Sequence, residues 1–157
     1  MISLIVAYSK NRVIGNNGII PWKIKGEQKR FKELTTGNIV VMGRHSYEEI
    51  GRPLPNRMTY LVSSTMMIDE ENCKTVTSLE EALSMANGKD IYISGGAMLY
   101  MEALPLVDRM YITIIEKEID GDTYFPNFDE DLFNIIYEET FVGDIPYRYL
   151  TYERKSH

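Results

Sequence analysis

Two hydrophobic patterns alternate along the chain and predict its secondary structure. Short runs rich in Ile, Val and Tyr predict strands, whereas apolar residues spaced three or four positions apart predict helices. The predicted strands span residues 2–8, 39–43, 59–63, 74–76, 91–94, 109–116, 133–141 and 147–154. The predicted helices span residues 26–35, 44–50, 79–87 and 97–104. Gly37 and Gly88 end two of these helices, and Ser78 with Glu81 forms a capping box at the start of the third.

The order and character of these elements predict an α/β fold. The early strands are almost continuously apolar, as in "SLIVAY" and "IVVMG", which is typical of parallel strands covered on both faces. No helix separates the last two strands, so we expect them to add an antiparallel hairpin at one edge. In an open sheet of this kind, ligands bind outside the carboxyl ends of the strands. The strand-to-helix junctions are therefore the candidate sites.

Length and composition predict a single domain over residues 1–157 and exclude several classes of protein. Cys73 is the only cysteine, and His45 and His157 are the only histidines, which argues against a disulfide framework and a metal centre. No apolar run approaches the roughly 20 residues that span a bilayer, and "MISLIVAYS" lacks the flanks of a signal peptide. We therefore expect a cytoplasmic protein without a membrane partner.

The charge distribution favours a small anionic ligand over nucleic acid. The net charge of −6 argues against general affinity for nucleic acid. Residues 23–57 nevertheless hold eight of the 17 basic residues, so one region of an acidic chain is locally basic. Such a region would steer a small anion toward a site.

Polar residues after two of the predicted strands indicate a phosphate site. Gly43 allows a tight turn, and Arg44, His45 and Ser46 follow it where a helix start presents free N–H groups. Ser63 and Ser64 follow the next strand, where a site preferring NAD usually has an acid; with Arg44 nearby they favour NADP. Both stretches have a simpler interpretation, because solvated helix starts and Ser-Ser turns are common.

Three further segments contain candidate residues. Gly95 and Gly96 would let the backbone approach a pyrophosphate, although the G-x-G-x-x-G fingerprint is absent and a diglycine turn is common. Residues 14–22 form a glycine-hinged loop with an apolar tip, typical of a lid over an aromatic ligand. "GRPLPNR" is a rigid proline turn ending in Arg57, which would bind a carboxylate or simply be solvated.

Glu27 is the one acid in the basic stretch "PWKIKGEQKRFK". At helical spacing it shares a face with Phe31 and Leu34, which favours an inward-facing carboxylate. A solvated charge is the alternative, and the stretch alone does not decide between them.

Taken together, the motifs resemble the dihydrofolate reductase family over essentially the whole chain. They are "RVIG" (12–15), "PW" (21–22), "FK" (31–32), "MGRHSYEEIGRPLPNR" (42–57), "SS" (63–64), "SGG" (94–96), "YIT" (111–113) and "GDTYFP" (121–126). The resemblance implies an eight-stranded, mostly parallel sheet with four flanking helices. It also implies NADPH as cofactor, 7,8-dihydrofolate as substrate, antifolate inhibitors as ligands, and a monomer.

The same resemblance assigns residue roles. Glu27, Trp22 and Thr113 would form the catalytic set, with Thr113 hydrogen-bonded to Glu27 and the proton reaching the pterin through water. The substrate would contact Ile5, Ala7, Gln28, Phe31, Lys32, Ile50, Leu54, Arg57, Ser94 and Tyr100. The cofactor would contact Ala7, Ile14, Gly15, Gly18, Ile20, Gly43, Arg44, His45, Ser46, Ser63, Ser64, Gly95, Gly96, Ala97, Met98, Leu99 and Thr123, with a cis Gly95–Gly96 peptide.

Several positions depart from the common bacterial pattern of the family. Glu27 replaces the usual Asp, Gln28 replaces an apolar residue, and Ser94 replaces Ile or Val at the edge of the pterin. Met98 stands where many relatives have Arg, which puts one pyrophosphate contact in doubt. The pattern is similar to the trimethoprim-insensitive class carried on plasmids and integrons, so we expect weakened trimethoprim binding.

Two other functions remain open from the sequence. A pyrimidine reductase of riboflavin synthesis shares this fold but does not call for Arg57 or the Glu27–Thr113 pair. A nucleotide-binding or RNA-regulating protein without catalysis would not need the acid at all.

Overall fold

The computed structural model describes residues 1–15 and 27–156, with the backbone alone for Glu27 and Gln28. Within this part of the chain, one large sheet contains nine strands in the order β10-β11-β8-β1-β7-β3-β4-β6-β5. Their bounds are β1 Ile2–Ser9, β3 Ile39–Gly43, β4 Met58–Val62, β5 Asp69–Glu70, β6 Cys73–Val76, β7 Ile91–Ile93, β8 Arg109–Ile115, β10 Phe133–Phe141 and β11 Tyr147–Arg154. A separate pair joins β2 (Val13–Gly15) to β9 (Thr123–Tyr124).

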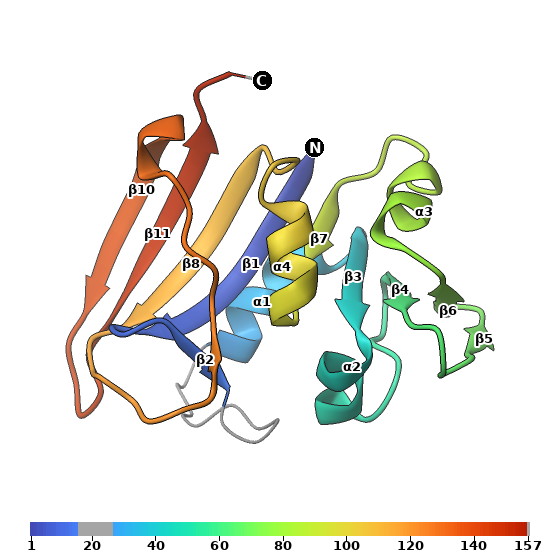
Figure 1. Cartoon of the computed structure of the whole chain (residues 1–157), viewed down its shortest axis with the longest axis horizontal. Helices are drawn as coiled ribbons and strands as arrows, with labels where there is room; N and C mark the ends of the chain where they lie inside the picture. Colours follow the sequence, from blue (N-terminus) through green and yellow to red (C-terminus); the bar gives the residue numbers. More distant parts are fainter. Residues whose placement is uncertain (16–26, 157) are drawn as a thin grey trace.

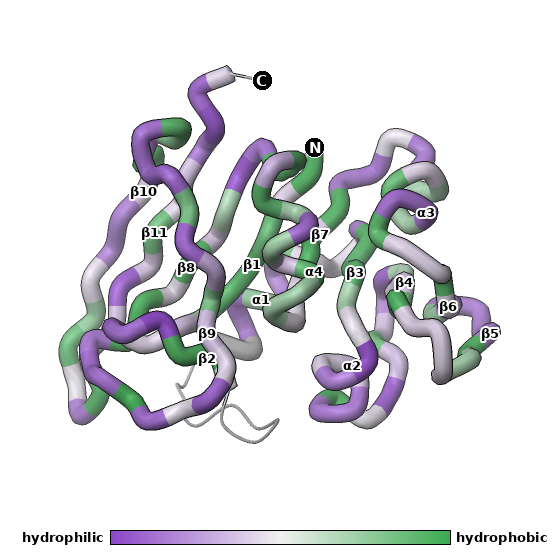
Figure 2. The backbone as a smooth tube through the Cα atoms, viewed as in Figure 1, coloured by the Kyte–Doolittle hydropathy of each residue, from purple (hydrophilic) through white to green (hydrophobic). Residues whose placement is uncertain are grey.

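Strand direction follows the hydrophobic pattern. β1 is parallel to β7 and β8, and β3 is parallel to β4 and β7. β11 runs antiparallel to both β8 and β10, so the predicted C-terminal hairpin is confirmed. Figure 2 shows hydrophobic residues concentrated in β1 and its central neighbours, with hydrophilic residues in the peripheral loops. The central strands are thus the ones buried on both faces, as expected for parallel strands.

Four α-helices flank the sheet in the described part of the chain. They are α1 (Glu27–Thr35), α2 (Arg44–Ile50), α3 (Leu79–Ser84) and α4 (Ala97–Ala103), and a short 3₁₀ turn, η1, covers Glu130–Leu132. In Figure 1, α4 lies in front of the sheet and α1 behind it, while α2 lies below the carboxyl end of β3. Helices on both faces leave the carboxyl ends of the central strands available for ligands. No described helix is long and apolar enough to cross a membrane.

The structure differs from the predicted elements in several details, among them the unpredicted pair of β2 and β9. The sheet gains a ninth strand, β5, whose two residues pair antiparallel with β6 at the edge. The third helix ends at Ser84 rather than at residue 87, because Met85 already departs from the helical conformation with a φ of −90° and a ψ of 1°; Asn87 and Gly88 then follow in left-handed conformations. Its predicted N-cap is present, since the Ser78 side chain accepts a hydrogen bond from the Glu81 N–H.

An aromatic cluster holds the β9 segment against the sheet. The Phe125 ring lies 5.2 Å from the ring of Tyr8 on β1 and 5.2 Å from that of Tyr100 on α4. Phe125 and Tyr100 are buried, and both belong to the main hydrophobic core. This packing fixes β9, and therefore β2, at the carboxyl end of β1, beside the predicted site.

Candidate active site

The loops that follow β3 and β7 meet at the carboxyl edge of the sheet. The Gly43 N–H donates to the Gly95 carbonyl at 2.7 Å, so the two predicted phosphate-binding turns are joined directly. The Gly95–Gly96 peptide is cis, as the family resemblance implies. The starts of α2 and α4 therefore lie side by side, and both direct N–H groups to the same edge.

The space around Gly95 is too small for a side chain. A Cβ there would be 2.8 Å from Ser46 Oγ and 3.3 Å from Tyr100 Oη, and the φ of Gly95 is +125°. Tyr100 Oη donates to the Ile5 carbonyl at 2.9 Å, which ties α4 to β1. Burial raises the pKa of the Tyr100 phenol well above its ordinary value, so this group stays protonated. Ser46, Tyr100 and Ile5 are thus brought together around the diglycine.

Arg44 lies against the turn that follows β4. Its Nη1 donates to Thr65 Oγ1 at 3.2 Å, and its Nε pairs with Glu48 at 2.5 Å. Ser63 Oγ accepts from the Thr65 and Met66 N–H groups at 3.2 and 3.0 Å. Arg44 therefore approaches the Ser63 turn, as expected. The hydrogen bonds that Ser63 Oγ accepts are also those of an ordinary serine turn, which was the simpler interpretation of this stretch. Thr65 was not predicted, although it extends the hydroxyl run "SST".

The predicted substrate wall is assembled from β1, β8 and α1. Ala7 pairs directly with Thr113 across β1 and β8, and Ile5 lies two residues earlier on β1. Thr113 Oγ1 accepts from Arg30 Nη1 on α1 at 3.1 Å. Phe31 on α1 and Leu54 after α2 are half-buried, whereas Ile50 is exposed over 36% of its surface. Ser94, directly after β7, is half-buried and donates its N–H to the Val41 carbonyl at 2.9 Å.

Arg57 is buried, which contradicts the solvated alternative. It is only 7% exposed, its Nη1 donates to Thr35 Oγ1 at 3.0 Å, and its Nε donates to the Pro55 carbonyl at 2.9 Å. Desolvation lowers the pKa of the guanidinium from its ordinary value, although the group remains a cation. A buried cation oriented by two neutral acceptors is well suited to bind a carboxylate.

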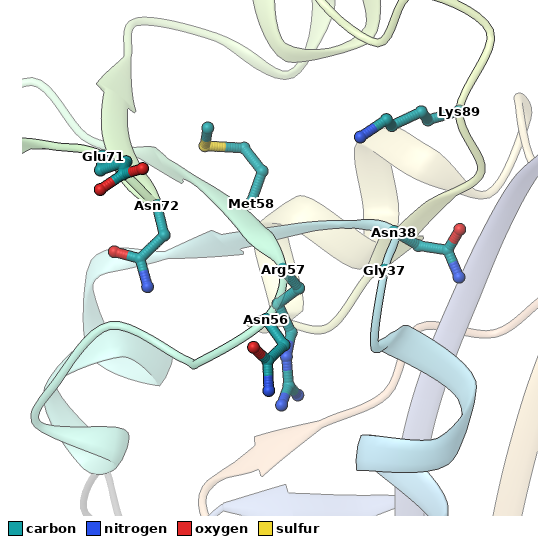
Figure 3. Close-up of a pocket in the computed structure, with 8 residues that line it drawn as sticks. All are labelled: Gly37, Asn38, Asn56, Arg57, Met58, Glu71, Asn72 and Lys89. Carbon is teal, nitrogen blue, oxygen red and sulfur yellow. The ribbon is translucent and has the colours of Figure 1, made fainter.

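A cavity of about 580 Å³ has Arg57 among its lining residues. Figure 3 shows its lining, in which the Arg57 side chain extends away from the side chains of Met58 and Lys89. The lining residues precede β3, β4, β6 and β7 and so mark the amino ends of these strands. The cavity is therefore at the edge opposite Gly43 and Gly95.

The remaining predicted residues fall into three groups. Gly15 pairs with Thr123 across β2 and β9, and Ile14 packs against the core. Lys32, His45, Ser64 and Met98 are exposed, Gly96 and Ala97 are half-buried at the start of α4, and the Leu99 side chain is in the core. Gly18, Ile20 and Trp22, with the side chains of Glu27 and Gln28, lie outside the described part of the structure.

Glu49 is a candidate that the sequence analysis missed. Desolvation raises the pKa of its carboxyl, the nearby His45 lowers it, and Glu49 in turn raises the pKa of Tyr100. Glu49 is exposed on α2 and acts on the buried Tyr100 phenol only through its charge; its position one turn from Ser46 was the available signal. Among the described residues, no cluster of His, Cys, Asp and Glu is arranged to hold a metal ion.

Comparison with known proteins decides the family. The model of the family described as "Dihydrofolate reductase" matches residues 1–154. The chain belongs to the dihydrofolate reductase family. Members of this family are oxidoreductases that use NADPH, and this chain is accordingly such an enzyme.

Three relatives that bear the family name match this chain over most of their length. Dihydrofolate reductase of Bacillus subtilis is 38% identical, over 99% of this chain and 96% of that protein. Dihydrofolate reductase type A13 of Escherichia coli is also 38% identical, over 99% and 95%. Type 3 of Salmonella typhimurium is 42% identical, over 82% and 80%.

A solved structure shares the whole fold. Dihydrofolate reductase from Enterococcus faecalis, complexed with NADP(H) and RAB-propyl, superimposes with a TM-score of 0.90 at 34% identity. The match covers 99% of this chain and 97% of that one. The expected dihydrofolate reductase fold is therefore confirmed.

Proposed function

We propose that the chain reduces 7,8-dihydrofolate to 5,6,7,8-tetrahydrofolate with NADPH and so supplies one-carbon metabolism. The observation that carries the proposal is the family match over residues 1–154. The buried, oriented guanidinium of Arg57 supports it, because the substrate ends in a glutamate. The test is NADPH consumption that depends on dihydrofolate.

The residues at the carboxyl edge fit NADPH. Glycine at 95 leaves a space that a Cβ would fill, and the joined turns at Gly43 and Gly95 bring the N–H groups of two helix starts together. Arg44 and the hydroxyls of Ser63 and Thr65 offer donors to a 2′-phosphate. When bound, NADPH supplies the hydride that is transferred to C6 of the pterin.

Gly95→Ala is expected to raise the KM for NADPH about tenfold or more, which corresponds to about 1.4 kcal/mol. The added Cβ would meet Ser46 Oγ and Tyr100 Oη at a φ that L residues rarely adopt. Gly88→Ala is the matched control, since Gly88 has a φ of +79° with open space around its Cβ position. Both variants should lose thermal stability. An unchanged KM in Gly95→Ala would show that the cofactor does not approach Gly95.

We assign the remaining steps of the reaction to four side chains. Glu27 is the proton source for N5 of the pterin, acting through water, and Thr113 hydrogen-bonds its carboxylate. The helical spacing predicts that this carboxyl faces Phe31, where burial would raise its pKa and favour protonation near neutral pH. Arg57 binds the α-carboxylate of the glutamate tail, with Lys32 nearby on α1.

We also propose that the enzyme is poorly inhibited by trimethoprim and confers resistance. Gln28 and Ser94 replace apolar side chains at the edge of the pterin, and Ser94 directly follows β7 at the carboxyl edge. Each lost apolar contact is worth roughly 1.5–3 kcal/mol. An inhibitor that depends on these contacts loses more affinity than a substrate also held by its glutamate.

The double variant Gln28→Leu with Ser94→Ile restores two apolar side chains and should bind trimethoprim more tightly than the native enzyme, by about a hundredfold or more. Inhibition constants and the KM for dihydrofolate, measured on the same preparations, check this. Ser84→Ile, at the exposed end of α3, is the control and should change neither value. If the native enzyme is already inhibited as tightly as sensitive bacterial enzymes are, the resistance proposal is wrong.

We infer a single-domain monomer that works in the cytoplasm without nucleic acid or membrane partners. One hydrophobic core runs from Leu4 in β1 to Tyr152 in β11, which supports a single domain. Sedimentation of the purified enzyme tests the monomer.

A further inference from the structure

Arg44 is held from two sides by other side chains. Its Nε donates to Glu48 Oε1 at 2.5 Å, one turn further along α2, and its Nη1 donates to Thr65 Oγ1 at 3.2 Å on the turn after β4. Thr65 is itself fixed, because its N–H donates to Ser63 Oγ at 3.2 Å. The two partners of Arg44 belong to different elements, so together they restrict the rotation of its guanidinium.

These two contacts occupy only part of the guanidinium. A guanidinium carries five N–H donors, on Nε, Nη1 and Nη2. Among the described residues, the hydrogen bonds of Arg44 use Nε and one hydrogen of Nη1, and none uses Nη2. Nη1 and Nη2 therefore keep two parallel donors, the arrangement that binds two oxygens of one phosphate. Because the Arg44 side chain is 51% exposed, a phosphate can reach this edge.

We propose that Glu48 is a positioning residue, which orients Arg44 toward the 2′-phosphate of NADPH and so strengthens the preference for NADPH over NADH. This inference rests on the proposed function of Arg44 as a donor to that phosphate. A long arginine side chain loses rotational freedom when it binds a ligand, and this loss weakens binding. The contact with Glu48 removes part of the loss in advance. NADH has a hydroxyl in place of the phosphate, so its affinity does not depend on the orientation of Arg44.

The negative charge of Glu48 has an opposing effect, which the geometry keeps small. A carboxylate repels a phosphate, so Glu48 would weaken NADPH binding if the two groups were close together. Its carboxylate contacts Arg44 through Nε, whereas the phosphate would approach Nη1 and Nη2 at the other end of the guanidinium. The side chains of Arg44 and Glu48 are 51% and 43% exposed, so water and salt screen the repulsion. The positioning effect is therefore expected to exceed the repulsion.

The cofactor affinities of Glu48→Gln test the proposal. Calorimetric titration should give a Kd for NADPH about three- to fivefold above that of the native enzyme, with the Kd for NADH unchanged. A folding defect would weaken both cofactors alike, so the ratio of the two Kd values reports positioning. The single-turnover rate at saturating NADPH should stay the same, since the contact contributes to binding only. Glu33→Gln is the matched control: it removes an equal charge from another exposed ion pair, in α1, and should change neither Kd.

A double variant shows whether Glu48 acts through Arg44. Arg44→Met removes the donors and should raise the Kd for NADPH about tenfold or more. Adding Glu48→Gln to Arg44→Met should then produce no further change, because the two side chains act in one chain of contacts. A further change would overturn the proposal. So would tighter NADPH binding in Glu48→Gln alone, which would show that the carboxylate competes with the phosphate, or weaker NADH binding, which would show that it binds the ribose hydroxyl.

The role of Arg44 and the role of Glu48 fail in different ways. If Arg44→Met keeps the native preference for NADPH, Arg44 does not bind the 2′-phosphate, and the positioning role of Glu48 is wrong with it. If Arg44→Met loses that preference but Glu48→Gln keeps it, only the positioning role is wrong. Thermal unfolding of each variant confirms that the affinities refer to folded enzyme.

Discussion

The Glu27→Gln variant is expected to reduce dihydrofolate about a hundredfold or more slowly than the native enzyme at pH 7. A positioned acid or base typically contributes a factor of about 10² to 10⁴ to the rate. The amide of glutamine has nearly the shape of the carboxyl but cannot deliver a proton to N5. The loss should therefore appear in the hydride-transfer rate, while NADPH binding is preserved.

The pH dependence gives this prediction a second measurement. In the native enzyme the rate should fall as pH rises through the pKa of Glu27, since the protonated carboxyl is the active form. In Glu27→Gln that decline should disappear. Glu33→Gln, at an exposed position of α1, is the matched control and should keep both the rate and the profile. Near-normal turnover in Glu27→Gln would contradict the assignment.

Arg57→Met is expected to raise the KM for dihydrofolate about a hundredfold, which corresponds to about 3 kcal/mol. Removing the buried, charge-assisted partner of a carboxylate typically costs about 2–5 kcal/mol of binding free energy. Here the guanidinium is held in place by Thr35 and Pro55, so little ordering is needed when the substrate binds. The proposed NADPH site at Gly43 and Gly95 lies at the opposite edge of the sheet from Arg57, which precedes β4, so the KM for NADPH should be unchanged.

A truncated substrate shows whether Arg57 acts on the glutamate tail. The native enzyme and Arg57→Met should reduce 7,8-dihydropteroate, which lacks the glutamate, with similar efficiency. Arg52→Met, which removes an exposed cation from the same proline turn, should behave like the native enzyme on both substrates. If Arg57→Met loses as much activity on dihydropteroate as on dihydrofolate, the assigned contact is wrong and the loss is structural.

Most of the fold could be predicted because its signals are local. The eight predicted strands all exist, with bounds that differ by at most one residue, since most of them are runs of apolar residues buried in the sheet; β10, which is largely exposed, is the exception. α2 ends before Gly51, whose φ of +79° is the left-handed conformation that glycine adopts at helix ends. Patterns of this kind depend on a few neighbouring residues and need no knowledge of tertiary contacts.

The short elements could not be predicted, because tertiary contacts create them. β2, β5 and β9 have two or three residues each, too few to show a period. β9 is positioned by the packing of Phe125 on Tyr8 and Tyr100, residues that lie far from it in the sequence. The early end of α3 depends on the backbone conformation of Met85, which its position in an apolar pattern does not reveal.

The candidate site likewise has a part that local sequence motifs predict and a part that depends on tertiary contacts. The glycine turns and the serine pair stood out as motifs, because the chemistry of phosphate binding requires small residues and donors at strand ends. The burial of Arg57 was not evident, since a proline turn is normally exposed. The contact between Arg30 and Thr113 joins residues 83 positions apart, and no local pattern indicates it.

The most direct test of the account is NADPH consumption by the purified chain with 7,8-dihydrofolate. The account predicts that NADPH is consumed in equal amount to the dihydrofolate supplied, that tetrahydrofolate forms, and that neither occurs when one of the two is left out. A pyrimidine reductase would instead consume NADPH with a pyrimidine of riboflavin synthesis. A folded chain that binds NADPH but does not oxidise it in the presence of dihydrofolate would contradict the central claim.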